Sequence, residues 1–148
     1  MGAGEAGYEG AGTEGGSFLD TTKWNQSFKM ELLADGEEAE VRVAAAATQP
    51  KKEGGGVVLA LQLVCTNPRV DDIYHYTRLP DDELMAEDMK AWNKAVNRLE
   101  RIADCFGVEH EGQLVFTDFN GKSGWIIARL EDSDRGKRNA VREFVVGR

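Results

Sequence analysis

One apolar stripe at helical spacing divides this chain and limits the folds open to it. Apolar side chains recur at steps of four and three from Met85 to Phe106, and a glycine follows as a natural helix end. Pro80 and the three acids after it mark the start, because acidic side chains are favourable in a first helical turn. The pattern predicts one long helix whose apolar face, with Trp92 at its centre, is packed in the core.

Alternating segments flank this helix, three before it and two after it. They cover residues 39–46, 57–66, 73–79, 125–131 and 140–146, and alternation of this kind is typical of strands.

The alternation also predicts which side chains face inward. In the first segment the odd-numbered residues, Ala45 among them, form the apolar face. In the third segment Tyr74 and Tyr76 share one face, and Ile73 and His75 lie on the other, which we assign to the interior.

Five short strands with a helix between the third and the fourth form the element order of the OB-fold. That fold is a partly open five-stranded barrel that often binds oligonucleotides or oligosaccharides. An α+β sandwich can share the order and stays the alternative. We therefore expect a mainly β protein, an OB-fold-like barrel with one long helix that plugs one end.

The 148 residues suffice for one domain. Residues 1–16 hold seven glycines, three glutamates and one aromatic residue, which predicts a disordered tail. This tail is either a simple leader or an acidic competitor for a basic groove. The single domain then covers residues 17–148. Within it, residues 17–36 form an arm in which Phe28, Met30 and Leu32 alternate, as in a short strand or an extended segment.

Several classes of protein are disfavoured by composition. The start of the chain has no signal-peptide pattern, and the longest apolar run, residues 57–65, is too short to span a bilayer. The two cysteines lack CxxC partners, which argues against a disulfide scaffold and a zinc site. Neither His75 nor His110 has neighbours at ligand spacing. We expect a cytosolic protein with no membrane contact, no cofactor, no metal and no catalysis.

The net charge of −8 is unevenly distributed. Residues 1–40 carry −7, residues 41–118 carry −4, and residues 119–148 carry +3. The chain as a whole lacks the basic footprint of a nucleic-acid-binding protein, although its last third is basic.

Two blocks of sequence carry a resemblance to a known family. The first is a pair of strands joined by a Lys/Gly loop, residues 40–66. The second is the element Asp-Phe-Asn-Gly-Lys at residues 118–122, followed by a strand, a charged loop and Asn139. In both blocks the chain resembles a family of small bacteriophage proteins, long catalogued as a domain of unknown function and likened to phage single-stranded DNA-binding proteins. Phe119 stands where that family usually has an aliphatic residue.

The resemblance implies single-stranded DNA binding with little sequence selectivity during phage DNA replication or recombination. The location it implies is the cytoplasm of the infected host cell. The partners it implies are single-stranded DNA and phage replication or recombination proteins.

A single-strand binder needs aromatic faces for bases and cations for phosphates. Tyr74 and Tyr76, with Arg78 beside them, have this chemistry, although the tyrosines could equally pack under the arm or at a dimer interface. For Trp125, core packing is favoured over stacking. Trp24 in the arm is either a lid or a cover for the core.

The cations lie in two predicted loops that flank one groove in an OB-fold, residues 49–56 and 132–139. The alternative is a pair of solvated loops. The expected DNA-binding residues are Tyr74, Tyr76, Arg78, Lys51, Lys52, Arg42, Lys122, Trp125, Arg129, Arg135, Lys137 and Arg138.

The net charge favours a second hypothesis, a protein-interaction accessory module of a replication or recombination complex without nucleic-acid affinity of its own. Exposed strand edges often pair between subunits, so a homodimer is compatible with either hypothesis.

Overall fold

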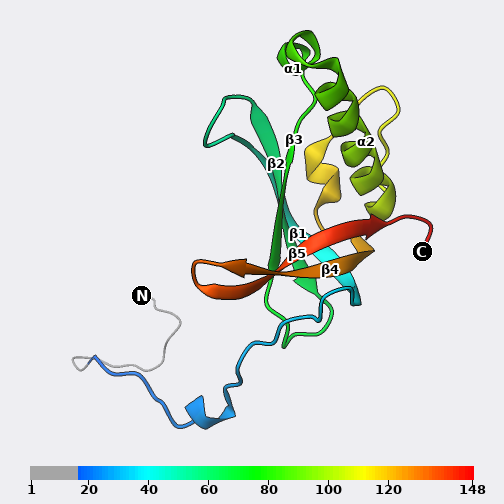
Figure 1. The fold of residues 1–148 in the computed structure, drawn as a ribbon. Helices are drawn as coiled ribbons and strands as arrows, with labels where there is room; N and C mark the ends of the chain where they lie inside the picture. The colour runs from blue at the N-terminus through cyan, green and yellow to red at the C-terminus, as the bar shows by residue number, and fades with distance from the viewer. Residues whose placement is uncertain (1–16) are drawn as a thin grey trace.

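The computed structural model describes residues 17–148, so the predicted disordered tail, residues 1–16, lies outside the described residues. The described part is a five-stranded antiparallel sheet with one long helix against it (Figure 1). In chain order the elements are η1 (Trp24–Gln26), β1 (Glu38–Pro50), β2 (Val57–Cys65), β3 (Ile73–Arg78), α1 (Asp82–Glu87), α2 (Met89–Phe106), η2 (Phe116–Phe119), β4 (Ser123–Ser133) and β5 (Gly136–Val145).

The strand order in the sheet is β3-β2-β1-β4-β5, with every neighbouring pair antiparallel. β4 returns after the helix to lie beside β1, which is the connection of a Greek key. The sheet is open, because the ladders of the described residues do not join β3 to β5. These two edge strands meet through side chains, with the rings of His75 and Phe144 packed edge to face at 4.9 Å. The predicted mainly β architecture is confirmed at this level.

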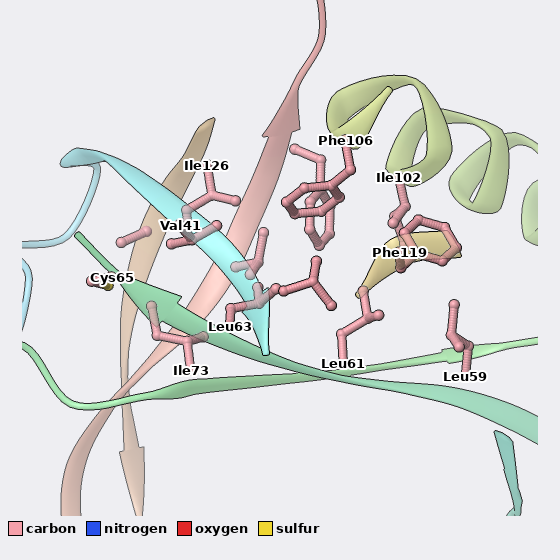
Figure 2. Packing of buried hydrophobic residues seen from close by; sticks show 14 of the residues in the cluster. Val41, Leu59, Leu61, Leu63, Cys65, Ile73, Ile102, Phe106, Phe119 and Ile126 are labelled. Carbon is pink, nitrogen blue, oxygen red and sulfur yellow. The ribbon is translucent and has the colours of Figure 1, made fainter. Parts of the chain in front are cut away.

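The core lies between the inner face of the sheet and the second half of α2. Figure 2 shows Ile102 and Phe106 pointing from α2 toward the strands. Phe119 from η2 is fully buried in the same cluster. A Cβ atom at Gly124 would lie 2.9 Å from the carbonyl oxygen of Cys105, so glycine there lets β4 approach the end of α2 closely.

The first strand is longer than its sequence pattern indicates, and it changes face partway. Val41 and Val43 are fully buried, but a bulge follows between Val43 and Ala45. Ala45 is therefore exposed, and its predicted place on the inner face is wrong. An extra residue at a bulge shifts the alternation of side chains, which simple period-two counting does not anticipate.

The helical region is broken once, where one continuous helix was predicted. Asp81 caps α1 as its acidic context indicates, accepting a hydrogen bond from the Leu84 N–H at 2.8 Å. Asp88 has a non-helical backbone (ψ 93°), and its side chain caps α2 by accepting from the Ala91 N–H. Aspartate favours such capping over a place inside a helix.

The buried residues of α2 are Ala95, Ile102, Ala103 and Phe106, so α1 and the first turn of α2 lie outside the core. α1 and the first turns of α2 extend past the end of β3 (Figure 1). Met89 is accordingly 58% exposed, and Trp92 is half-buried and outside the core cluster. The prediction of Trp92 as a core residue is wrong, because the apolar stripe is longer than the sheet it packs on.

The arm is extended, as its alternation predicts, and is tied down near its end. Glu31 forms a parallel bridge with Val70. Asn139 clamps the backbone of Leu33: its Oδ1 accepts from the Leu33 N–H at 2.8 Å, and its Nδ2 donates to the Leu33 carbonyl oxygen at 3.0 Å. Leu33 is buried, whereas residues 17–32 are exposed. Across residues 17–148, no helix has the length and apolar character needed to cross a membrane.

Candidate nucleic-acid interface

Two tyrosines stand side by side on the outer face of β3. Tyr74 and Tyr76 are 54% and 56% exposed, while Ile73 and Thr77 on the opposite face are buried. The predicted assignment of the two faces of β3 is confirmed. Their exposure argues against both core packing and burial under the arm.

Two alanines lie beside the ring of Tyr76. The strand register places Ala60 of β2 opposite Tyr76, and Ala47 of β1 opposite Ala60. Gln62 lies opposite Tyr74 and donates to Asp72 at 2.8 Å. Tyr76 therefore stands beside a low floor of alanines, whereas Tyr74 stands beside the longer Gln62. The exposure of both rings leaves them accessible to a planar ligand. Sequence reasoning did not identify this floor, although the alanine run at residues 44–47 is a visible signal for it.

Arg78 is not the free cation that was predicted beside the tyrosines. Its side chain is only 18% exposed and forms an ion pair with Asp81 at 3.3 Å. The guanidinium lies against the backbone of Gly56, where an added Cβ would be 2.3 Å from the Arg78 Cζ. The hydrogen bond from Leu84 N–H to Asp81 and the nearby Arg78 charge hold the pKa of the Asp81 carboxyl below its usual value. Arg78 thus supports the turn between β1 and β2, and its predicted role in DNA binding is unsupported by its position.

The turn between β1 and β2 carries the first pair of predicted cations. It covers residues 51–56 and is closed by the Lys51 N–H, which donates to the Gly56 carbonyl oxygen at 2.9 Å. Lys51 and Lys52 are exposed and have no ion-pair partner among residues 17–148. Their charges remain available to a ligand.

The second group of predicted cations is largely neutralised. The segment predicted as a loop is mostly ladder, since β4 runs to Ser133 and β5 starts at Gly136. Asp132 pairs with Lys137 at 2.8 Å, and Glu131 pairs with both Arg138 (2.9 Å) and Arg129 (3.2 Å). Arg135, in the turn itself, has no ion-pair partner within the described part of the chain.

The two hairpins extend to the same side of β3 in Figure 1. The β1–β2 hairpin lies toward the end of β3, and the β4–β5 hairpin toward its start. The turns at both tips thus lie on one side of β3 in this view.

Trp125, Arg42 and Lys122 belong to a different part of the sheet, where β1 pairs with β4. Trp125 is half-buried and lies opposite Glu40, with the Arg148 guanidinium 4.3 Å from the centroid of its ring. The prediction of Trp125 as a core residue is wrong, because Ile126 occupies the inner face of β4. Arg42 and Lys122 are exposed beside it and are not grouped with the tyrosines. Trp24 is 59% exposed, so it does not cover the core.

Titratable groups of the described residues do not form a reactive cluster. Burial lowers the pKa of His75 to about 4, so its imidazole is neutral at pH 7. Burial raises the pKa values of the Cys65 and Cys105 thiols, and both cysteines are free. Among residues 17–148, no group of three or more His, Cys, Asp or Glu side chains could hold a metal ion.

The chain matches no protein-family model, and a comparison with curated proteins gives no match either.

Proposed function

We propose that this protein binds single-stranded DNA with little sequence selectivity, on an OB-fold-like barrel. Two features support the fold: the Greek-key strand order, and the placement of α1 and α2 between the third and fourth strands. OB-folds bind oligonucleotides on the face of strands 2 and 3 and with the loops that join strands 1 and 2 and strands 4 and 5. In chain order, the tyrosine face on the third strand and the turns after the first and fourth strands correspond to these elements, which supports the proposal.

The observation that carries the proposal is the exposed pair Tyr74 and Tyr76 on the outer face of β3, with alanines beside Tyr76. Contiguous exposed apolar surface, unlike single scattered side chains, marks candidate binding sites. Base stacking on such rings is worth about 1–3 kcal/mol per base and tolerates any sequence, because every base has a π-face. Stacking, more than charge, would supply the affinity.

The electrostatic contribution would be local and modest. The net charge of −8 opposes long-range attraction to DNA. At the two hairpin turns, the cations without an ion-pair partner among residues 17–148 are Lys51, Lys52 and Arg135. The dependence of affinity on salt should therefore be shallow. The resemblance to small phage proteins supports a proposed role in phage DNA replication or recombination, in the cytoplasm of the infected cell. No catalytic step is part of the proposal.

Fluorescence anisotropy with labelled oligo-dT tests the proposal. We expect saturable binding at low salt, weakened about tenfold or more in the double variant Tyr74→Ala/Tyr76→Ala. The matched control, Tyr74→Phe/Tyr76→Phe, keeps both rings and should bind nearly as well as the natural chain. Circular dichroism should show all three proteins folded, since both side chains are exposed.

The accessory-module hypothesis predicts a different result. It is favoured by the net charge and by the exposed apolar side chains of the arm. Absence of oligo-dT binding at low salt by the natural chain would reject the proposal and leave this hypothesis. Equal binding by the Ala and Phe double variants would reject the tyrosine face as the site.

A further inference from the structure

The exposed side of α2 carries a row of cations. Residues 89–99 contain three bases and no acid, in a chain whose net charge is −8. Lys90, Lys94 and Arg98 follow one another at steps of four, which places them along one side of the helix with a rise of about 6 Å between neighbours. All three are exposed, and none has an ion-pair partner among residues 17–148. We name these three side chains the basic stripe.

The two signs of charge are separated around α2. At about 100° per residue, its two acids, Glu100 and Asp104, lie about 80–120° around the helix from Lys94, the middle of the basic stripe. Two acids precede the stripe: Asp88, whose carboxylate caps α2 by accepting a backbone N–H at 3.1 Å, and Glu87 at the end of α1. Over α2 itself four bases stand against two acids, so the helix has a net charge of +2.

The basic stripe borders the opening between the edge strands β3 and β5. Arg101, on the same side of α2, donates to the Phe144 carbonyl oxygen at 2.7 Å and pairs with Glu143 at 2.8 Å, which turns this side of the helix toward β5. The Phe144 ring in turn packs against the ring of His75 on β3. Burial lowers the pKa of His75, and the charge of Arg98 acts in the same direction, so the last member of the stripe lies near this contact.

One strand separates the basic stripe from the tyrosine face. β3 is at the edge of the sheet, with β2 on its other side, and α2 packs against it (Figure 1). Tyr74 and Tyr76 point to the outer face of β3, whereas His75 points to the inner side, toward the opening that the stripe borders. A chain that passes over the free edge of β3 therefore goes from the tyrosines to the cations of α2.

We infer that a single strand stacked on Tyr74 and Tyr76 continues around the free edge of β3 and that its phosphates contact the basic stripe of α2. This inference rests on the proposed function and extends its site to a second element. A row of evenly spaced cations along a helix suits a polymer that carries one phosphate per nucleotide. Since no member of the stripe is engaged in an ion pair within the described residues, binding phosphates there breaks no internal contact of that kind.

Fluorescence anisotropy with oligo-dT of two lengths tests the inference. We use about 4 and about 16 nucleotides, the limits of the range that one OB-fold covers. The variant Lys90→Ala/Lys94→Ala/Arg98→Ala should bind the long oligonucleotide about tenfold more weakly at low salt. Its slope of log affinity against log salt should be shallower by about 2, because each lost phosphate contact removes about 0.7. The short oligonucleotide, held at the tyrosines, should bind the variant and the natural chain nearly equally.

The two lengths also separate local contacts from net charge. Removing three cations makes the whole protein more acidic, which would weaken both oligonucleotides alike, so an equal loss at both lengths would overturn the inference. The matched control Lys90→Arg/Lys94→Arg/Arg98→Lys keeps all three charges and should bind both lengths as the natural chain does. Circular dichroism should show both variants folded, since the three side chains are exposed and alanine, lysine and arginine favour helices.

Failure of this inference and failure of the proposed function give different results. A natural chain that binds neither oligonucleotide would reject the proposed function and this extension with it. A natural chain that binds both, with unchanged affinity and salt slope for the long oligonucleotide in the alanine variant, would overturn the extension alone. That second result, together with binding of labelled poly-glutamate that the alanine variant loses, would assign the basic stripe to an acidic protein segment instead.

Discussion

The β1–β2 and β4–β5 hairpins have similar lengths and both carry cations near their turns, yet their cations are in different states. In the β4–β5 hairpin the ladder sets Glu131 directly opposite Arg138 and Asp132 directly opposite Lys137. In the β1–β2 hairpin the ladder ends at the pair Pro50 and Val57, and Lys51 and Lys52 lie beyond it. The β1–β2 hairpin therefore presents its positive charge to solvent, whereas the β4–β5 hairpin largely neutralises its own.

The two hairpins also differ in how their turns are supported by the rest of the fold. The β1–β2 turn is supported from below by Arg78, which lies against Gly56. The β4–β5 turn has open space around Gly136. The β1–β2 hairpin, whose cations are available, is thus also the hairpin whose turn is held in place. A count of basic residues in a segment does not reveal this, because strand register decides which charges are paired.

The largest expected effect concerns the contact between the two edge strands, His75 of β3 against Phe144 of β5. Burial lowers the pKa of His75 from 6.5 to about 4, and the nearby charges of Arg129 and Arg98 act in the same direction. Between these pH values the unfolded chain binds a proton that the folded chain does not, so the free energy of unfolding decreases as the pH falls from 6.5 to 4. We expect this residue to account for a loss of up to about 3 kcal/mol.

Urea unfolding at pH 7 and at pH 4.5 measures this loss. The variant His75→Phe keeps an aromatic ring against Phe144 and cannot titrate, so its stability should depend less on pH than that of the natural chain. Identical pH dependence of the two proteins would show that His75 is not the group responsible.

The next effect compares the two turns. Gly56 has a φ of 88°, and a Cβ there would displace the Arg78 guanidinium, so Gly56→Ala should destabilise the fold by about 2 kcal/mol. Gly136 has a φ of 108° and no atom within 4 Å of an added Cβ, so Gly136→Ala should cost about 1 kcal/mol. Thermal unfolding of both variants checks the order.

Adding Arg78→Ala to each variant separates the cost of the clash with Arg78 from the cost of the positive φ. It should reduce the cost of Gly56→Ala and leave the cost of Gly136→Ala unchanged. An equal cost for the two glycines would mean that Arg78 does not support the first turn.

A smaller effect separates the cations of the two hairpins in DNA binding. Lys51→Ala/Lys52→Ala should flatten the dependence of log affinity on log salt by about 1.4, because each lost phosphate contact to a single strand removes about 0.7. Lys137→Ala/Arg138→Ala should change that slope less, since both side chains are engaged with Glu131 and Asp132. Titrations with oligo-dT at several salt concentrations give the slopes, and a reversed order would contradict the comparison.

The smallest effect follows from releasing the paired cations. Glu131→Gln removes the carboxylate that pairs with both Arg129 and Arg138. We expect oligo-dT to bind a few-fold more tightly at low salt, with folding stability lowered by no more than about 1 kcal/mol, as is usual for exposed ion pairs. Asp134→Asn, in the adjoining turn, removes an exposed acid that forms no ion pair within residues 17–148 and serves as the control for net charge.

Local patterns in the sequence determined most of the elements. Alternation located all five strands and placed Tyr74 and Tyr76 outward, because side chains on a strand point to opposite faces in turn. The acids after Pro80 and the glycine at 107 fixed the two ends of the helical region, because capping is a property of a few neighbouring residues.

Tertiary structure decided what depends on residues distant in the sequence. The bulge after Val43, the exposure of Trp92 beyond the edge of the sheet and the support of the β1–β2 turn by Arg78 all depend on where another element ends or packs. Cross-strand register likewise decided which cations are paired. A local pattern states which face a side chain takes, but only the assembled sheet and helix decide what that face meets.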